Sequence, residues 1–397
     1  MAPSGKGVTY IQKIFATVNN DDLLEFRIPG NVKGNMLLSD VMLRFVVKIP
    51  QTLHAGKIIP QNYFGAKQFG SLEIRINGEA VTRRNCANEY FLASYFTGIT
   101  NYNVDYSITG CNTFGIFDAS NLVTAAITAN VNGFQSIING RKGIADDYTY
   151  EMVLPIEASI FSSNSTLPTN TPLDLSFERT KSKLSLLKIE DTDISPDFTD
   201  VLQLEDPYLI VPYTIFPDKP TVGLSGDEQI KFDDYVINRF NVPTGSTNIR
   251  ISNVLSGELP TKIFFGLMDL KSVAGDFSTS STLLQRHDVK KVTVYLDGNV
   301  ITGFPISMTD SYVAIPYTRF MTSTNRYINN FVGRMITQSE FKYYHFIHCV
   351  SLDSSLKGSL TFEFEFEQTV SDQLVLVTCA IHDRTLELDQ YRNFRIL

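Results

Sequence analysis

Residues 72–81 read Leu-Glu-Ile-Arg-Ile-Asn-Gly-Glu-Ala-Val, and residues 292–301 read Val-Thr-Val-Tyr-Leu-Asp-Gly-Asn-Val-Ile. In both stretches apolar residues alternate with polar ones up to an Asn-Gly or an Asp-Gly pair. This alternation is typical of a strand with one buried face, and both dipeptides favour the tight turn of a β-hairpin. The two stretches therefore predict the same strand–turn–strand unit twice, 220 residues apart.

A second pair of matching stretches lies nearer the end of each half. Residues 173–178 read Leu-Asp-Leu-Ser-Phe-Glu, and residues 360–365 read Leu-Thr-Phe-Glu-Phe-Glu. A further apolar strand is expected after each, over 184–189 and over 374–381. Because the two pairs of matches occur in the same order, they predict an internal duplication. The first copy is expected to carry its extra residues in a long polar loop at about 97–147.

Alternating stretches dominate the chain, whereas helical patterns are few. Clean alternation favours antiparallel sheets over the fully apolar strands of a parallel sheet. One helix is expected over 88–98, where Asn88 can cap the start and Gly98 suits the stop, and a second over about 317–331. Neither helix alternates with strands as βαβ units require, so the expected class is mainly β, built of sandwiches.

An acidic stretch separates the two copies. Residues 190–206 contain seven Asp or Glu and no Lys or Arg, and Pro196 interrupts them. Such a charge run is typical of a solvated linker. We therefore expect a first domain over 1–200, including the long loop, and a second domain over 201–397.

Composition excludes several classes of protein. The chain has 397 residues, a net charge of −8, 43% hydrophobic and 19% charged residues, and no Trp. An apolar-rich chain of low charge is not disordered, and an acidic chain is a poor coat for nucleic acid, which requires clustered Lys and Arg. The absence of Trp counts against sugar stacking.

The sequence shows no secretory signal at its start, and its longest apolar stretches are far shorter than the roughly 18 residues that a membrane span needs. None of the four cysteines is in a Cys-x-x-Cys pair, so reduced thiols in an intracellular protein are expected. These cysteines are Cys86, Cys111, Cys349 and Cys379.

Two segments resemble metal sites superficially. Residues 345–349 read His-Phe-Ile-His-Cys; on a strand, His345 and Cys349 would share one face and His348 would point to the other, so a structural role is predicted. The acidic stretch offers Asp191 and Asp193, but a Pro stands where a calcium loop needs Gly. A solvated linker is the favoured interpretation there, with weak calcium binding as the alternative.

No residue set is predicted to carry catalysis or cofactor binding. Several features are more typical of ordinary structure: the thiol of Cys86 beside a helix start, the sequon at Asn164, the acidic strand face of Glu363, Glu365 and Glu367, and the basic pairs 83–84, 141–142 and 290–291. The sequence therefore predicts a protein that is not an enzyme, has no metal or cofactor, and has no specific nucleic-acid site. Abundant Tyr and Phe favour protein–protein interfaces instead.

The chain resembles the double jelly-roll major capsid proteins of Maverick/Polinton-type elements and related small double-stranded DNA viruses, in the lineage of tailless-phage and adenovirus coat proteins. The resemblance spans nearly the whole chain, except residues 100–147. Its motifs are individually short and follow the family's order, at residues 24–30, 36–50, 69–79, 88–90, 172–179, 257–260, 263–267, 292–298, 358–364 and 389–395.

This resemblance implies two tandem antiparallel eight-stranded jelly-roll sandwiches with a few short helices in the loops. It also implies a homotrimer whose six sandwiches form a pseudo-hexagonal capsomer of an icosahedral virion, assembled inside the host cell. A penton protein and other minor capsid proteins, a packaging ATPase and a maturation protease would be the partners. The alternatives are a two-domain β-sandwich attachment protein that binds glycans and a β-sandwich hydrolase.

Overall fold

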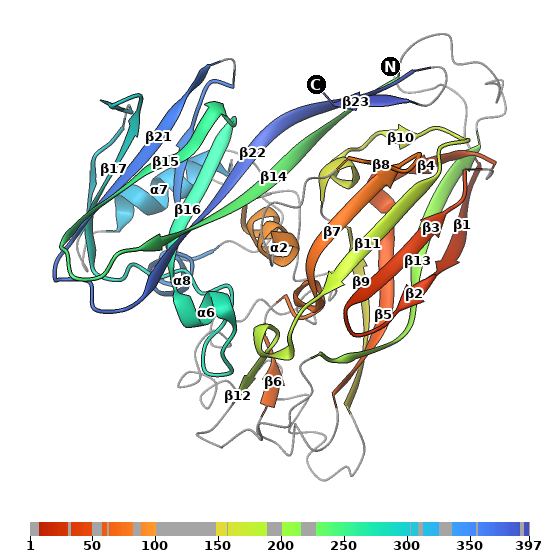
Figure 1. Cartoon of the computed structure of the whole chain (residues 1–397), viewed down its shortest axis with the longest axis horizontal. Helices are drawn as coiled ribbons and strands as arrows, with labels where there is room; N and C mark the ends of the chain where they lie inside the picture. Colours follow the sequence, from red (N-terminus) through yellow and green to blue (C-terminus); the bar gives the residue numbers. More distant parts are fainter. Residues whose placement is uncertain are drawn as a thin grey trace.

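The computed structural model describes most of the chain. The described residues are 8–30, 33–49, 58–61, 63–81, 89–100, 148–156, 158–188, 201–215, 228–301, 303–308, 313–324, 336–354, 356–389 and 393–396. They form two β-sandwiches that lie side by side, the first built from the earlier part of the chain and the second from the later part (Figure 1). The predicted mainly β class is confirmed.

The first sandwich consists of two antiparallel sheets. One sheet contains β1 (Val8–Phe15), β13 (Gln203–Ile215), β5 (Met42–Ile49) and β9 (Tyr148–Pro155), with the short strands β4 (Asn35–Leu37) and β10 (Thr166–Leu167). The facing sheet contains β2 (Val18–Asn19), β3 (Leu23–Ile28), β11 (Leu173–Arg179), β7 (Phe69–Ile76) and β8 (Glu79–Ala80). Strand β13 pairs with β1 along one edge and with β4 and β5 along the other.

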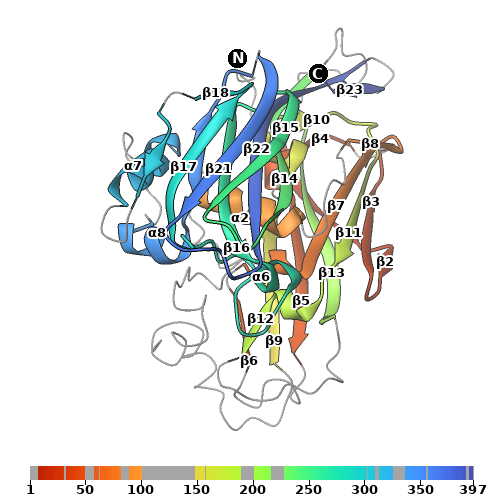
Figure 2. The same ribbon diagram turned by 60° about the vertical axis from the view of Figure 1, so that its left-hand side comes forward.

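The second sandwich has the same construction. One sheet contains β14 (Glu228–Val242), β22 (Leu374–Leu388), β16 (Lys262–Asp269) and β20 (His348–Ser351), and β23 (Phe394–Ile396) joins β22. The other contains β15 (Asn248–Glu258), β21 (Lys357–Phe366), β17 (Val289–Leu296), β18 (Asn299–Val300) and β19 (Ile306–Ser307). Figure 2 shows the two sheets of this sandwich face to face.

The order of strands shows that one topology is used twice. In the first sandwich the sheets read β1-β13-β5-β9 and β3-β11-β7-β8, and in the second β14-β22-β16-β20 and β15-β21-β17-β18. In each sandwich the first strand lies beside the last long strand, β13 or β22, which is the Greek-key arrangement of a jelly roll. The two stretches of sequence that match each other, at 72–81 and 292–301, form equivalent hairpins. Both hairpin turns have the expected positive φ, at Asn77–Gly78 and at Asp297–Gly298.

The strand pairing places the division between the sandwiches later than the predicted position near residue 200. Strand β13 extends to Ile215 and belongs entirely to the first sandwich. It is the counterpart of β22, whereas the predicted strand at 184–189 yields only β12 (Leu186–Lys188), paired with β6 (Ile58–Pro60). The acidic run does not mark the boundary, because its last residues, Glu205 and Asp206, lie at a β-bulge within β13. The pairing register of β13 with β5 shifts there, and Pro207 is accommodated.

The helices follow the prediction in part. Helix α2 (Glu89–Thr100) confirms the helix expected over 88–98, and α7 (Ala314–Ser323) begins ahead of the one expected over 317–331. Helix α8 (Gln338–Tyr344) was missed, because the aromatic residues before His345 suggested a strand. The other short helices of the described residues are α6 (Leu270–Ala274), η1 (Leu38–Asp40), η2 (Ala66–Gln68), η4 (Ser159–Ser162) and η5 (Ser182–Leu184). Among the described helices, none is long and apolar enough to cross a membrane.

Alternating aromatic residues fill the interior of each sandwich. Phe177 of β11 lies against Phe69 of β7, with ring centroids 4.9 Å apart. In the second sandwich Phe362 of β21 stacks on Phe265 of β16 at 4.4 Å, and both rings are fully buried. Because residues two apart share one strand face, the period-two pattern of the sequence directly specifies these packed rings.

Candidate functional site

The histidines of the segment 345–349 are core residues in separate surroundings. His345 Nδ1 lies 2.8 Å from the hydroxyl of Tyr95 in α2. His348, on β20, stacks on the ring of Phe265 at 5.2 Å, and burial lowers its pKa from 6.5 to about 3, so it is neutral at physiological pH. The described residues contain no group of three or more His, Cys, Asp or Glu that could hold a metal ion.

The acidic face of β21 is paired with basic and hydroxyl groups of the same chain. Glu365 accepts a hydrogen bond from Lys290 Nζ at 3.0 Å, which lowers the pKa of its carboxyl group. Glu363 accepts from the Tyr295 hydroxyl at 3.1 Å, and Glu367, one residue past the end of β21, accepts from Arg286 at 3.0 Å. Each carboxylate thus has its own partner, so these groups act as cross-strand ties rather than as a catalytic pair.

The other sequence candidates contribute less. Asn164 is exposed in the turn after η4. The residues that lie outside the described part of the chain are Cys86, the calcium-like residues Asp191 and Asp193, the basic pairs 83–84 and 141–142, and the loop over 101–147.

A group of buried polar contacts lies where the two sandwiches meet. Lys67 of η2 is fully buried, and its Nζ donates to Gln61 Oε1 at 2.7 Å. The same amine lies 3.3 Å from the hydroxyls of Ser280 and Thr282, which belong to the second sandwich's loop before β17. Burial lowers the pKa of Lys67 well below 10.5. We call this group of residues the Lys67 cluster.

Gln61 joins this cluster to strand β12. Its carbonyl oxygen also accepts from the backbone N–H of Ser281 at 3.2 Å, and its Nε2 donates to the Leu186 carbonyl at 2.9 Å. The loop is further anchored by Ser281 Oγ, which donates to the Leu184 carbonyl at 2.8 Å. Because buried polar groups without partners are costly, this satisfied network holds the loop of one sandwich against the other.

A second set of contacts covers the outer edge of β14. Ser162 of η4 accepts a hydrogen bond from the backbone N–H of Asp233 at 3.2 Å and donates to its carbonyl oxygen at 3.3 Å. Glu89, the first residue of α2, accepts from the N–H of Ile237 at 3.4 Å. Side chains of the first sandwich therefore take the place of a neighbouring strand along β14, whose only strand partner in the described chain is β22.

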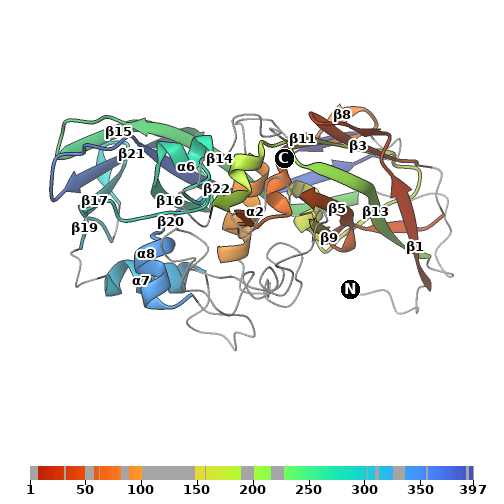
Figure 3. The ribbon, with the colours of Figure 1, turned by 90° about the horizontal axis from the view of Figure 1, so that it is seen from below.

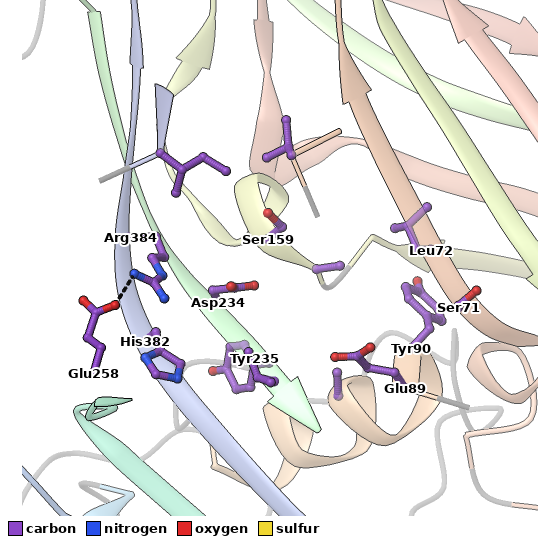
Figure 4. A pocket seen from close by; sticks show the side chains of 15 residues that line it. Ser71, Leu72, Glu89, Tyr90, Ser159, Asp234, Tyr235, Glu258, His382 and Arg384 are labelled. Carbon is purple, nitrogen blue, oxygen red and sulfur yellow. Dashed lines mark hydrogen bonds and ion pairs between the residues drawn. The ribbon is translucent and has the colours of Figure 1, made fainter. Parts of the chain in front are cut away.

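A cavity of about 360 Å³ lies along the same boundary. Figure 4 shows that Glu89 and Tyr90 reach it from α2, Asp234 and Tyr235 from β14, and His382 with Arg384 from β22. Arg384 is paired with Glu258 of β15 at 2.9 Å, which lowers the pKa of that carboxyl group. Burial lowers the pKa of His382. The cavity mixes acidic, basic and aromatic groups from both sandwiches.

Sequence reasoning missed this junction. Gln61 and Lys67 stand in a stretch without clear periodicity, and the serines and threonines at 278–282 look like an ordinary polar loop. Lys67 itself, a lone lysine among apolar and aromatic residues, is the feature that could have indicated a buried polar site. Its partners at Ser280 and Thr282 lie more than 200 positions away in the chain, so no local pattern connects them.

Comparison with solved structures identifies the fold. The structure of the Sputnik virophage superposes with a TM-score of 0.59 at 11% identity, covering 100% of this chain and 89% of the other. The mavirus major capsid protein superposes at 0.56 and 11% identity, covering 98% and 90%. The Faustovirus major capsid protein superposes at 0.51 and 10% identity, covering 97% and 91%.

No protein-family model matches the sequence, and no curated protein matches it. At such low identity the likeness is one of fold and extends over the full length of the chain. The protein has the double jelly-roll fold found in the major capsid proteins of these viruses.

Proposed function

We propose that this chain is a viral major capsid protein, a structural subunit that assembles with copies of itself into a shell. The observation that carries the proposal is the pair of jelly rolls of the same topology joined by a buried polar junction. The full-length likeness to major capsid proteins of mavirus and Faustovirus supports it.

The two-sandwich chain has a geometric use in such a shell. Three copies supply six similar sandwiches, which is the number needed to fill a six-coordinated position of an icosahedral lattice. We therefore propose a homotrimeric, pseudo-hexagonal capsomer of the Maverick/Polinton type, assembled inside the host cell. A penton protein at the five-fold positions and other minor capsid proteins are the proposed partners.

A lattice subunit must hold its two sandwiches in one orientation. Domains joined through small polar interfaces usually move relative to each other. Here the Lys67 cluster and the covered edge of β14 link the sandwiches at two separate places. This double attachment supports a single rigid building block rather than two tethered binding modules.

Mass measurement in solution tests the proposal. Size-exclusion chromatography with light scattering is expected to give three times the chain mass of 44.6 kDa. The trimer should survive dilution, because obligate interfaces commonly bury more than about 2,000 Å². Electron micrographs should then show hexagonal particles or shells. A strict monomer at micromolar concentration would exclude the trimeric capsomer.

A further inference from the structure

We propose that helix α7 of one copy docks on the edge of strand β1 of the next copy, head to tail. The proposal rests on the capsid function proposed above and names the surfaces through which copies would join. Its basis is the internal junction, in which the first sandwich already covers the first strand of the second. If one topology is used twice, the same contact can be repeated between chains.

The internal contact defines the template. Strand β14 opens the second sandwich, and its free edge is covered by η4 and α2 of the first sandwich through Ser162 and Glu89. Helix α2 follows the β7–β8 hairpin in the chain. Figure 3 shows α2 between the two sandwiches.

The equivalent strand of the first sandwich is β1. Like β14, it opens its sandwich and lies beside the last strand, here β13. Within the described chain no strand pairs with its other edge. Its side chains are unusually apolar for such a position, since Ile11 is 66% exposed and Phe15 is 65% exposed. A long, exposed, apolar edge strand invites pairing or aggregation unless something covers it.

The equivalent helix of the second sandwich is α7. It follows the hairpin β17–β18 after the short strand β19, whereas α2 is the next described element after β7–β8. Ile315 in its first turn is 61% exposed, and Tyr343 of the neighbouring α8 is 52% exposed. Figure 3 shows α7 and α8 together below the strands of the second sandwich. Helix α7 therefore presents an exposed apolar residue in its first turn, the part of the helix through which α2 contacts β14.

A contact between α7 and β1 is heterologous, because each copy contributes a different surface. Repetition of a heterologous contact produces a closed ring when the rotation closes. Each chain carries one α7 and one β1, so in a closed ring of three chains none of the six surfaces is left free. The occupant of the β1 edge is thus a second copy of this chain.

Crosslinking between engineered cysteines tests the pairing directly. In a background with Cys86→Ser and Cys111→Ser, the variant carrying both Phe15→Cys and Ile315→Cys is treated with a short bis-maleimide reagent. We expect covalent dimers and trimers from this variant and none from either single substitution. The matched control pairs Phe15→Cys with Val300→Cys, since Val300 is 47% exposed on the β18 hairpin. Crosslinking by Phe15→Cys alone would show a symmetric contact and overturn the proposal.

Charge substitutions give an independent measurement. Phe15→Glu and Ile315→Glu are each expected to reduce the mass from three chains to one, with an unchanged circular dichroism spectrum, whereas Val300→Glu leaves the trimer intact. If the unmodified protein is a trimer but neither substitution nor crosslinking affects it as stated, this pairing is wrong and the capsid proposal stands. A monomeric unmodified protein would refute both.

Discussion

Replacement of Gln61 by Leu tests whether the Lys67 cluster holds the sandwiches together. Gln61 is fully buried, and Leu fills a similar volume without an amide. The substitution removes the acceptor of the Ser281 N–H and the donor to the Leu186 carbonyl, and it also removes the 2.7 Å acceptor of Lys67 Nζ, whose contacts with Ser280 and Thr282 remain. A buried group that loses its partner costs about 1–3 kcal/mol, so the two together should lower the free energy of unfolding by about 2–6 kcal/mol.

Urea denaturation followed by circular dichroism measures this loss at one fixed protein concentration, because self-assembly makes the transition concentration-dependent. Gln68→Leu is the matched control. Gln68 is also buried, but among the described residues its side-chain amide makes one bond, to the Phe64 carbonyl at 2.9 Å within the first sandwich. The control should therefore cost about 1–3 kcal/mol, less than Gln61→Leu.

A double-mutant cycle with Lys67→Met completes the test. Lys67 donates to Gln61 at 2.7 Å, so loss of Gln61 weakens the support of a buried amine. Once Met has replaced that amine, Gln61→Leu should cost less, with a coupling of about 0.5–3 kcal/mol. Additive effects, or a cost of Gln61→Leu no greater than that of Gln68→Leu, would refute the view that this cluster is a tightly coupled junction.

Three further outcomes are expected. Burial holds the pKa of Lys67 in the folded chain below 10.5, its ordinary value in the unfolded chain. Between these two pKa values the unfolded chain binds one proton more than the folded chain, so the free energy of unfolding rises with pH. In Lys67→Met this rise should be absent when urea denaturation is measured at neutral and alkaline pH. The pKa of His348 is 6.5 in the unfolded chain and about 3 in the folded chain, so the free energy of unfolding decreases as the pH falls below 6.5. At about pH 5 the loss in His348→Phe should be smaller by about 2 kcal/mol than in the unmodified protein. An equal loss in both proteins would contradict the assignment. Gly266→Ala should destabilise by about 1–3 kcal/mol in thermal unfolding, because a Cβ there would lie 2.8 Å from the Phe346 carbonyl oxygen; an unchanged midpoint would show that the strand relaxes.

Elements defined by local chemistry were predictable. The hairpins after Ile76 and Leu296 form because Asn-Gly and Asp-Gly accept positive φ, and the alternation before each turn decides which residues become buried. Helix α2 likewise starts and stops close to its predicted ends. These features depend on neighbours within a few positions, which the sequence displays directly.

Features that depend on distant partners were not predictable. The acidic residues before Tyr208 look like a linker, yet β13 belongs to the first sandwich because β1 and β5 flank it on both edges. Aromatic residues before His345 suggest a strand, whereas tertiary packing favours the helix α8. A local pattern cannot show which strand edge is already occupied.

Period-two alternation and turn dipeptides act over a few residues, so the class of the fold and its internal repetition could be predicted from them. The way in which the two jelly rolls are joined depends on contacts between distant residues. Lys67 meets Ser280, and Ser162 covers the edge of β14, across long separations in the chain. Folding buries polar groups at this boundary, and buried polar groups need hydrogen-bond partners. The contacts between these groups form the junction.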